Sequence, residues 1–420
     1  MTHSEQTLAL IKIGKHTQAE KEFEQALTKD TPENLFALAE SLSELGFSDW
    51  AEQVYQLLLK KFPDEDQLKT NLAEIAINNG KDEQAIAYLS SIKADSPAYL
   101  TALLVAADLY QTQGLFEVSE QKVLQAHQIA PTETAVVFGL AELYYDMKNY
   151  RSALAYYLEL LKSGQVVVAQ VNLVQRIGAC YAESGKFEQA LGYLEQIHTE
   201  DLSPDSLFQL SFTQFELKHY EDAIKSFNKL KASAPDYTTL YPVLAAAYEQ
   251  VGQLKEALLT AQEGLRVDQY NSKLYLQASR IALKLQQAKL AEKYLRQALT
   301  FDEDNLQLIT ELSNLLQQQK RFSENITFLK QANQALNDPQ LIWNLGRAYA
   351  AVEKDQAALE CYQGIQKDFD DNATYWQELT LLARRAGNLD LAKKAVKHYL
   401  TLVPNDLEML DLQDELAADF

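Results

Sequence analysis

Apolar residues follow the periodicity of an amphipathic helix along almost the whole chain. Within each short segment they fall at i, i+3, i+4 and i+7, so that one helix face is apolar and the other polar. A recurring phrase separates the segments, as in Gly46-Phe47-Ser48, which is followed by Ala51, Tyr55 and Leu58. The pattern therefore predicts short helices from end to end, joined by tight turns in which glycine adopts the required backbone angles at little cost.

The phrase recurs at a nearly constant distance. Gly46, Gly80 and Gly114 are 34 residues apart, and setting each glycine or its stand-in at position 15 defines eleven units. One interval between units is 37 residues, and the others are 33 or 34. The units begin at Pro32, Asp66, Leu100, Thr134, Val171, Pro204, Thr238, Ser272, Leu306, Pro339 and Ala373. A period of this length predicts a repeat protein built from helix pairs.

The residues at fixed positions of the unit resemble those of the tetratricopeptide repeat family. The W-x2-L-G-x2-Y half of the family pattern appears as Leu345-Gly346-x2-Tyr349, and the A-x3-F half as Ala358 and Tyr362. Small residues at positions 8 and 20 allow two helices to approach closely, and proline at position 32 of five units ends the second helix. The resemblance implies an all-α fold, an alpha-alpha superhelix that forms a solenoid of antiparallel helix pairs.

The repeats cover nearly the entire chain, and their interruptions suggest its divisions. Residues 1–31 match only the later part of a unit and are interpreted as a truncated N-terminal repeat. Four units span 32–167 and seven span 171–406, and the extra residues Ser163 to Gln170 are a candidate joint between subdomains. Residues 407–420 are acidic with interleaved leucines, which predicts a capping helix with a polar outer face.

Charge and composition narrow the class of partner. The 420-residue chain has a net charge of −21, which opposes binding to nucleic acid and to anionic membrane surfaces. No apolar run approaches the roughly 18 residues of a membrane span, and we expect no signal peptide. Cys180 and Cys361 lie far apart and predict neither a zinc site nor a disulfide framework. We therefore expect a cytoplasmic protein that binds a protein or peptide of basic or amphipathic character.

The resemblance also implies where such a partner binds. In the family, the first helix of each repeat lines the concave groove, and positions 2, 5, 9, 12 and 13 tend to point into it. These positions are mainly acidic in the N-terminal half of this chain and basic in the C-terminal half. The candidate groove residues are Phe36, Glu40, Glu74, Asp108, Phe138, Glu142, Tyr145, Phe208, Phe212, Phe215, Arg280, Arg347 and Arg384.

Two features of this candidate groove admit alternatives. Phe208, Phe212 and Phe215 share one helix face, either as an exposed patch that takes a basic or amphipathic peptide or as packing between adjacent first helices. The basic stripe either takes an acidic peptide or is simply solvated. The Lys/Asn clamp that some family members use for a C-terminal carboxylate is not expected, because Thr70, Phe208 and Leu276 stand at clamp-type positions.

No motif in the sequence indicates catalysis or a cofactor. Gly178 to Lys186 ends in Gly-Lys but continues with Phe187, which excludes a phosphate-binding Walker loop. No HExxH is present, and the six histidines are scattered. The sequence thus predicts a non-enzymatic scaffold or adaptor that binds a partner segment in its groove. A self-assembling structural protein and a peptide-sensing regulator remain open as alternatives.

Overall fold

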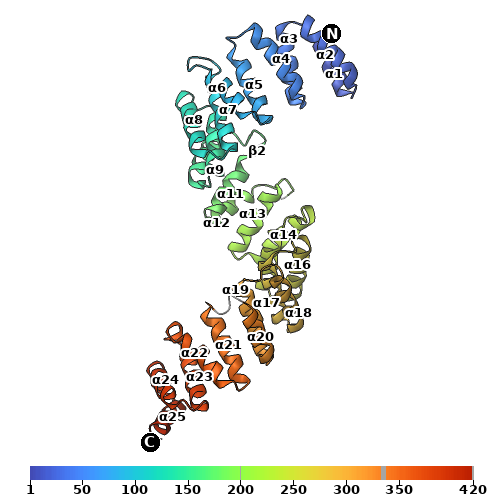
Figure 1. Ribbon diagram of the computed structural model, residues 1–420. Coiled ribbons are helices and arrows are strands. Elements are labelled where there is room, and N and C mark those ends of the chain that lie inside the picture. The colour runs from blue at the N-terminus through green and yellow to red at the C-terminus, as the bar shows by residue number, and fades with distance from the viewer. Residues whose placement is uncertain (199, 333–336, 419–420) are drawn as a thin grey trace. The chain divides into compact units, whose positions relative to one another are not determined.

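The predicted all-α fold is confirmed. The computed structural model describes residues 1–198, 200–332 and 337–418, and in these ranges the helices follow one another as antiparallel pairs (Figure 1). Within the described residues, the β-structure is a single hairpin of two-residue strands. The chain divides into two compact units, residues 1–213 and 214–420, and each is described by itself.

The odd-numbered helices are the first members of the pairs. They are α1 (His3–Lys12), α3 (Pro32–Glu44), α5 (Asp66–Asn78), α7 (Tyr99–Thr112), α9 (Thr134–Asp146), α11 (Leu173–Glu183), α13 (Pro204–Glu216), α15 (Leu240–Gln250), α17 (Ser272–Lys284), α19 (Leu306–Gln318), α21 (Pro339–Ala351) and α23 (Ala373–Arg385). The boundary between the two compact units falls within α13.

The even-numbered helices are the second members. They are α2 (His16–Lys29), α4 (Ser48–Lys61), α6 (Asp82–Ser90), α8 (Phe116–Ile129), α10 (Tyr150–Lys162), α12 (Phe187–Leu194), α14 (Tyr220–Ser233), α16 (Leu254–Val267), α18 (Ala288–Leu299), α20 (Phe322–Gln331), α22 (Asp355–Gly364) and α24 (Leu389–Leu402). The 3-10 helix η2 (Gln366–Phe369) follows α22, and α25 (Leu407–Ala418) follows α24.

Small residues at two positions of the unit explain why the paired helices pack so closely. Position 20, on the second helix, is fully buried in every unit, most often as alanine. Position 8, on the first helix, is equally small, and a Cβ added to Gly178 would lie 2.6 Å from the Leu194 side chain. At Gly346 it would lie 2.9 Å from the ring of Tyr362. A larger residue at position 8 would therefore push the two helices apart.

The turn inside each pair places one residue in the left-handed region of backbone conformation. Gly46 is representative, with a φ of 80°. Five units adopt the same conformation with a residue that has a Cβ, at positive φ angles of 58° to 64°: Lys148, Lys218, Gln286, Lys320 and Glu353. The fold thus imposes this turn even where the sequence lacks the glycine that favours it.

The two ends of the repeat array and its interruption have defined local structures. Residues 1–31 contain α1 and α2, and α1 has 10 residues where α3 has 13. The extra residues before α11 form a hairpin, in which β1 (Val167–Val168) pairs antiparallel with β2 (Val171–Asn172). Helix α25 buries Met409, Leu412 and Leu416 against the last pair, so it covers apolar surface that would otherwise be exposed.

Candidate partner-binding groove

Three carboxylates stand at the same place on three successive first helices. Glu40 lies on α3, Glu74 on α5 and Asp108 on α7, each at position 9 of its unit and 34 residues from the next. All three residues are exposed. We call the face of α3, α5 and α7 that carries them the N-terminal groove. Because one position recurs on neighbouring helices of one unit, the repeat itself sets these charges in a row.

The surface between these helices is hollowed. A depression of about 480 Å³ lies between α3 and α5, and Glu40, Glu74 and Tyr55 contribute to its lining. A second depression, of about 380 Å³, lies between α5 and α7 and is lined in part by Glu74 and Asp108. Glu74 therefore contributes to both, and the two depressions form consecutive sections of the N-terminal groove.

The electrostatics of the groove are those of uncompensated negative charge. Glu40, Glu74 and Asp108 form no ion pair with any residue in the described ranges. Partial burial raises the pKa of Glu74, and the charge of Asp108 raises it further. Burial also raises the pKa of Tyr55 to about 12; hydrogen bonds with Asn71 and Ser43 oppose this shift, and the charges of Glu40 and Glu74 add to it. A cation placed here would relieve repulsion that the chain itself leaves in place.

Glu142, at position 9 of the next unit, differs because the chain supplies its cation. Arg176 on α11 donates to Glu142 Oε2 at 2.8 Å, and the Tyr157 hydroxyl donates to Oε1 at 2.5 Å. The guanidinium carbon of Arg176 also lies 4.4 Å from the centre of the Tyr145 ring. The position-9 carboxylates therefore have no ion pair within the described residues in three successive units, whereas in the fourth unit Glu142 is paired with Arg176.

The predicted basic residues of the second compact unit are likewise paired. Arg280 donates to Glu311 from Nε at 3.0 Å and from Nη2 at 2.7 Å. Arg347 donates to Glu378 at 2.8 Å. A third contact, at 2.7 Å, joins Arg384 to Glu415 of α25. Because each guanidinium already has a carboxylate, these arginines do not form an uncompensated basic stripe.

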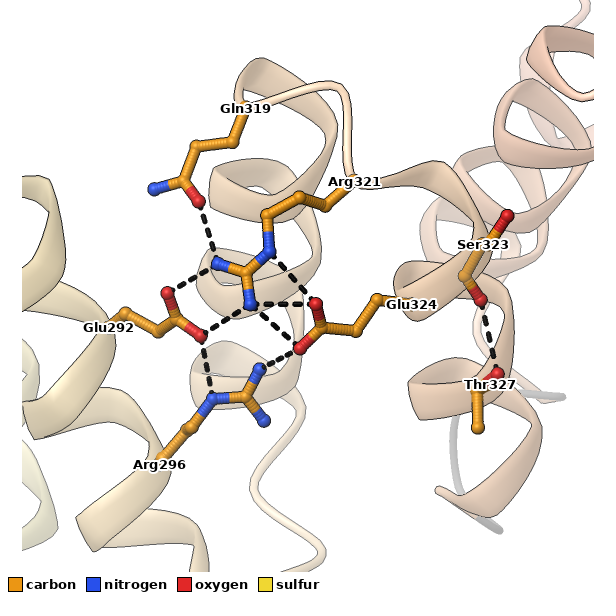
Figure 2. A network of polar contacts seen from close by, with 7 residues as sticks. All are labelled: Glu292, Arg296, Gln319, Arg321, Ser323, Glu324 and Thr327. Atoms are coloured by element: carbon orange, nitrogen blue, oxygen red, sulfur yellow. Dashed lines mark hydrogen bonds and ion pairs between the residues drawn. The ribbon is translucent and has the colours of Figure 1, made fainter.

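Second helices of the same compact unit carry a further ionic network, which the sequence analysis did not anticipate. Figure 2 shows Arg321, at the start of α20, between two carboxylates: it donates to Glu292 of α18 at 2.6 Å and to Glu324 at 2.8 Å. Arg296 contacts the same two carboxylates, at 2.8 and 2.7 Å. These contacts lower the pKa of Glu292, principally through the hydrogen bond from Arg321. The network joins α18 to α20 across a repeat boundary.

The candidate aromatic residues are half-buried, and all but Phe138 have a described contact with another ring. Phe36 packs edge-on against Tyr55, with 5.9 Å between ring centroids. Phe138 packs beside the apolar cluster of α9, α10 and α11, which is also where Tyr145 lies. Phe208 and Phe212 stack at 6.0 Å in the first compact unit.

The third phenylalanine of the predicted patch belongs to the other compact unit. Phe215 is half-buried and lies edge-on to Tyr220, with 5.6 Å between the ring centroids. Each of the three phenylalanine rings thus has an aromatic neighbour within its own compact unit. Their role in binding a partner stays a prediction.

Several residues that shape the first depression were not among those predicted from the sequence. Tyr55 was recognised only as part of the repeat pattern, yet it lines the depression together with Ser43 and Asn71. The ion pairs that join successive units were not predicted either. The sequence contains a signal for them, because Arg280 and Glu311, and likewise Arg347 and Glu378, carry opposite charges 31 residues apart. That separation joins position 9 of one unit to position 6 of the next.

Two other kinds of site are absent from the described part of the chain. None of its helices is long and apolar enough to cross a membrane. The described residues also contain no group of three or more His, Cys, Asp or Glu side chains arranged to hold a metal ion.

Several family models match parts of the chain. Models described as YpiA-like, tetratricopeptide repeats and YpiA-like, C-terminal tetratricopeptide repeats match residues 111–165 and 339–406. Two further tetratricopeptide repeat models match 205–237 and 272–305. A model described as Tetratricopeptide repeat protein 21 ARM repeat matches 2–114. These matches fall in both compact units.

Solved structures with low overall similarity include other repeat proteins. The chain is 12% identical to a chain of the APC/C hetero-tetramer Cut9–Hcn1, with a TM-score of 0.36, over 98% of this chain and 95% of that one. It is 17% identical to YrrB, described as a TPR protein with an unusual peptide-binding site, with a TM-score of 0.39, over 45% of this chain and 97% of that one. At these scores neither structure bears on the function of this chain.

Two curated proteins are similar to this chain in sequence. The chain is 29% identical to Protein DIA2 of Saccharomyces cerevisiae over 40% of its own length and 22% of that protein. It is 33% identical over 356 residues to the TPR repeat-containing protein YpiA of Bacillus subtilis, which is 84% of this chain and 82% of that protein. A match of this extent, together with the helix pairs and their period, shows that the chain belongs to the tetratricopeptide repeat family.

Proposed function

We propose that the protein is a non-enzymatic interaction scaffold whose N-terminal groove captures a basic or amphipathic segment of another protein. The observation that carries this proposal is the row formed by Glu40, Glu74 and Asp108. These carboxylates lie along two depressions and have no ion pair with any described residue. The equivalent or neighbouring groove charges in later units, such as Glu142 and Arg347, are paired within the chain.

The shape of the groove favours an elongated ligand. The two depressions are adjacent and share Glu74, so a segment that crosses α3, α5 and α7 meets three carboxylates in turn. Apolar side chains contribute to the lining between the charges, among them Ile75 in the first depression and Leu104 and Ile77 in the second. An amphipathic segment with basic residues on one side satisfies both kinds of surface.

Binding of a labelled peptide rich in lysine and arginine tests the proposal on the full-length chain. Fluorescence anisotropy would compare the wild type with the variant Glu40→Gln, Glu74→Gln, Asp108→Asn. We expect the variant to bind about tenfold more weakly at low salt, because three attractive charges are removed from the contact surface. The difference should shrink as the salt concentration rises.

A matched control carries the same change of charge on the second helices. Asp49, Glu83 and Glu117 are exposed and stand at position 18 of the same three units, in the first turns of α4, α6 and α8. Changing them to Asn, Gln and Gln should leave peptide affinity nearly unchanged. Equal loss of affinity in both triple variants would show that binding depends on net charge alone, and the proposed groove would have to be abandoned.

A further inference from the structure

One arrangement of side chains occurs in three units, and only two of its copies are complete. Position 24, on the second helix, is tyrosine in three units: Tyr55, Tyr157 and Tyr362. Each is almost fully buried, and its hydroxyl contacts a residue at position 9 of its own unit or at position 6 of the next. In the units of Tyr157 and Tyr362, these two positions form a carboxylate–guanidinium pair.

The complete copies share their chemistry although their charges are exchanged. In the first, the carboxylate is Glu142 at position 9 and the guanidinium is Arg176 at position 6. In the second, Arg347 is at position 9 and Glu378 at position 6. In both, the buried tyrosine donates to the carboxylate, at 2.5 Å for Tyr157 and 2.7 Å for Tyr362.

An aromatic face completes each of these copies. The guanidinium carbon of Arg176 lies 4.4 Å from the centre of the Tyr145 ring. That of Arg347 lies 3.9 Å from the centre of the Trp343 ring. Each copy therefore binds the guanidinium by a charge-assisted hydrogen bond on its edge and by a ring on its face.

The copy at Tyr55 has the carboxylate and the tyrosine but no cation, and the Tyr55 hydroxyl has Asn71 and Ser43 as its hydrogen-bond partners. Glu40 occupies position 9, as Glu142 does, while position 6 of the next unit is Asn71. Ser43 stands at position 12, where the first complete copy has Tyr145, and Phe36 stands at position 5, where the second has Trp343. Two large side chains of the first complete copy are thus replaced by two small ones, and the depression of about 480 Å³ lies at this place, lined by Ser43 and Asn71.

We propose that the depression between α3 and α5 binds one arginine side chain of the partner, in the place that Arg176 occupies in the complete copy. The proposal rests on the proposed function and names the residue that anchors the captured segment. Glu40 and Glu74 flank the guanidinium with two carboxylates, and Asn71 and the Tyr55 hydroxyl line the same space. The chain thus provides a guanidinium site in three units and fills two of them itself.

Arginine fits this site better than lysine for geometric reasons. A guanidinium is planar and presents five N–H donors in a fixed fork, so it can donate to Glu40 and Glu74 at the same time. The ammonium group of lysine is a compact, strongly hydrated charge, and it loses more hydration for the same contacts. The two complete copies both use arginine, although other cations of the chain could have served.

The experiment compares two blocked peptides that differ only in a single central residue, arginine or lysine, flanked by alanine and glutamine. Isothermal titration into the full-length chain should give affinity for the arginine peptide at least about fivefold above that for the lysine peptide. The variant Asn71→Arg supplies the missing cation from within. It should reduce the affinity for the arginine peptide at least about tenfold and raise the melting temperature.

Gln209→Arg is the matched control. Gln209 also stands at position 6, but position 9 of the preceding unit is Ala179, so the added arginine meets no position-9 carboxylate. The affinity of the Gln209→Arg variant for the arginine peptide should stay within about twofold of that of the wild type. Glu40→Gln, at an exposed residue, provides a second test if Asn71→Arg does not fold, and it should remove the preference for arginine.

The outcomes separate this inference from the function on which it rests. Equal affinity for the arginine and lysine peptides, with both lost in the triple groove variant, would overturn the arginine site and leave the proposed function intact. Binding of the arginine peptide that survives both Asn71→Arg and Glu40→Gln would place the peptide elsewhere and also overturn it. If neither short peptide binds while the longer basic peptide does, the anchor is not a single arginine.

Discussion

The N-terminal groove and the first-helix face of the second compact unit are built on the same repeat but treat their charges differently. In the groove, Glu40, Glu74 and Asp108 have no ionic partner in the described residues. On the other face, Arg280 and Arg347 each contact a carboxylate of the following unit. The backbone positions are equivalent, so the difference lies in whether position 6 of the next unit carries the opposite charge.

This difference implies that the paired charges mainly affect stability and that the unpaired charges mainly affect binding. A charge that is paired across a repeat boundary holds neighbouring units together and presents little net field to a ligand. A row of like charges without partners contributes no such stabilisation and attracts a ligand of opposite sign. Substitutions on the paired face should therefore change unfolding, whereas substitutions in the groove should change binding.

The largest effect on stability is expected for Glu378→Gln. Its carboxylate accepts hydrogen bonds from Trp343 Nε1 at 2.9 Å, Arg347 Nε at 2.8 Å and Tyr362 Oη at 2.7 Å. All three donate to the same oxygen, Oε2, so the amide oxygen can take its place but carries no charge, and the loss of the charge-assisted bonds should destabilise the second compact unit by about 2 kcal/mol. Urea unfolding followed by tryptophan fluorescence measures this.

A variant that keeps only the tryptophans of the second compact unit makes the fluorescence signal specific to that unit. Trp343 and Trp376 both lie in it, and Trp50→Phe removes the remaining tryptophan of the chain. Glu311→Gln is the matched control, because Glu311 has one cationic partner, Arg280, and should cost less than half as much. Equal costs for the two variants would contradict the proposed importance of the shared carboxylate.

The next largest effect is expected for Glu292→Gln, because the stability that the network in Figure 2 contributes should depend on pH. The pKa of Glu292 is lowered, chiefly by the hydrogen bond from Arg321, so the ionised carboxylate stabilises the folded chain. That stability is present above the ordinary glutamate pKa, about 4.3, and is lost as the pH falls through the lower folded value. Glu292→Gln should cost about 1 kcal/mol at neutral pH and clearly less near pH 3. Urea titrations at the two pH values test this, and a cost that does not depend on pH would refute the ionic explanation.

In the groove, Glu74→Gln should act in the opposite direction. Burial and the charge of Asp108 raise the pKa of Glu74, so its ionised form is disfavoured in the folded chain. Neutralising it should stabilise the first compact unit at neutral pH by less than about 0.5 kcal/mol, because the side chain keeps part of its surface in solvent, which screens its charge. The gain should disappear below the ordinary glutamate pKa, where both states are protonated. Destabilisation at neutral pH would mean that the carboxylate has a favourable partner after all.

The smallest effect is expected at the C-terminal end of the paired face. The side chains of Arg384 and Glu415 are 51% and 61% exposed, so solvent screens their interaction. Arg384→Ala should change the free energy of unfolding by less than about 0.3 kcal/mol. Thermal unfolding of this variant beside wild type provides the measurement, and a loss above about 1 kcal/mol would show that α25 depends on this contact.

The architecture could be predicted from the sequence because the repeat encodes it locally. Small residues at positions 8 and 20 and a turn at position 15 recur at fixed spacing, and each affects packing within a single helix pair. The turns at Gln286, Lys320 and Glu353 lack the glycine signal, and only the spacing indicated them. The hairpin of Val167–Val168 and Val171–Asn172 could not be foreseen, since so short a segment has no periodicity.

The candidate site was less accessible to sequence reasoning. The acidic and basic groove positions could be named from the repeat, but whether each charge is paired depends on a residue of the next unit. The extra residues before α11 lengthen that separation to 34 for Glu142 and Arg176, which conceals the 31-residue signal seen at Arg280 and Glu311. The depression at Tyr55 depends on Ser43 and Asn71 being small, which only the assembled unit makes visible.

Hydrogen exchange of the full-length chain, with and without the lysine- and arginine-rich peptide, tests the central claim most directly. The account predicts slower exchange in α3, α5 and α7 on addition of the peptide, and unchanged exchange in α17, α19, α21 and α23, where the groove-facing charges are already paired. The same protection should be absent in the variant Glu40→Gln, Glu74→Gln, Asp108→Asn. Protection confined to the second compact unit, or protection that persists in this variant, would contradict the claim that unpaired carboxylates make the N-terminal groove the binding surface.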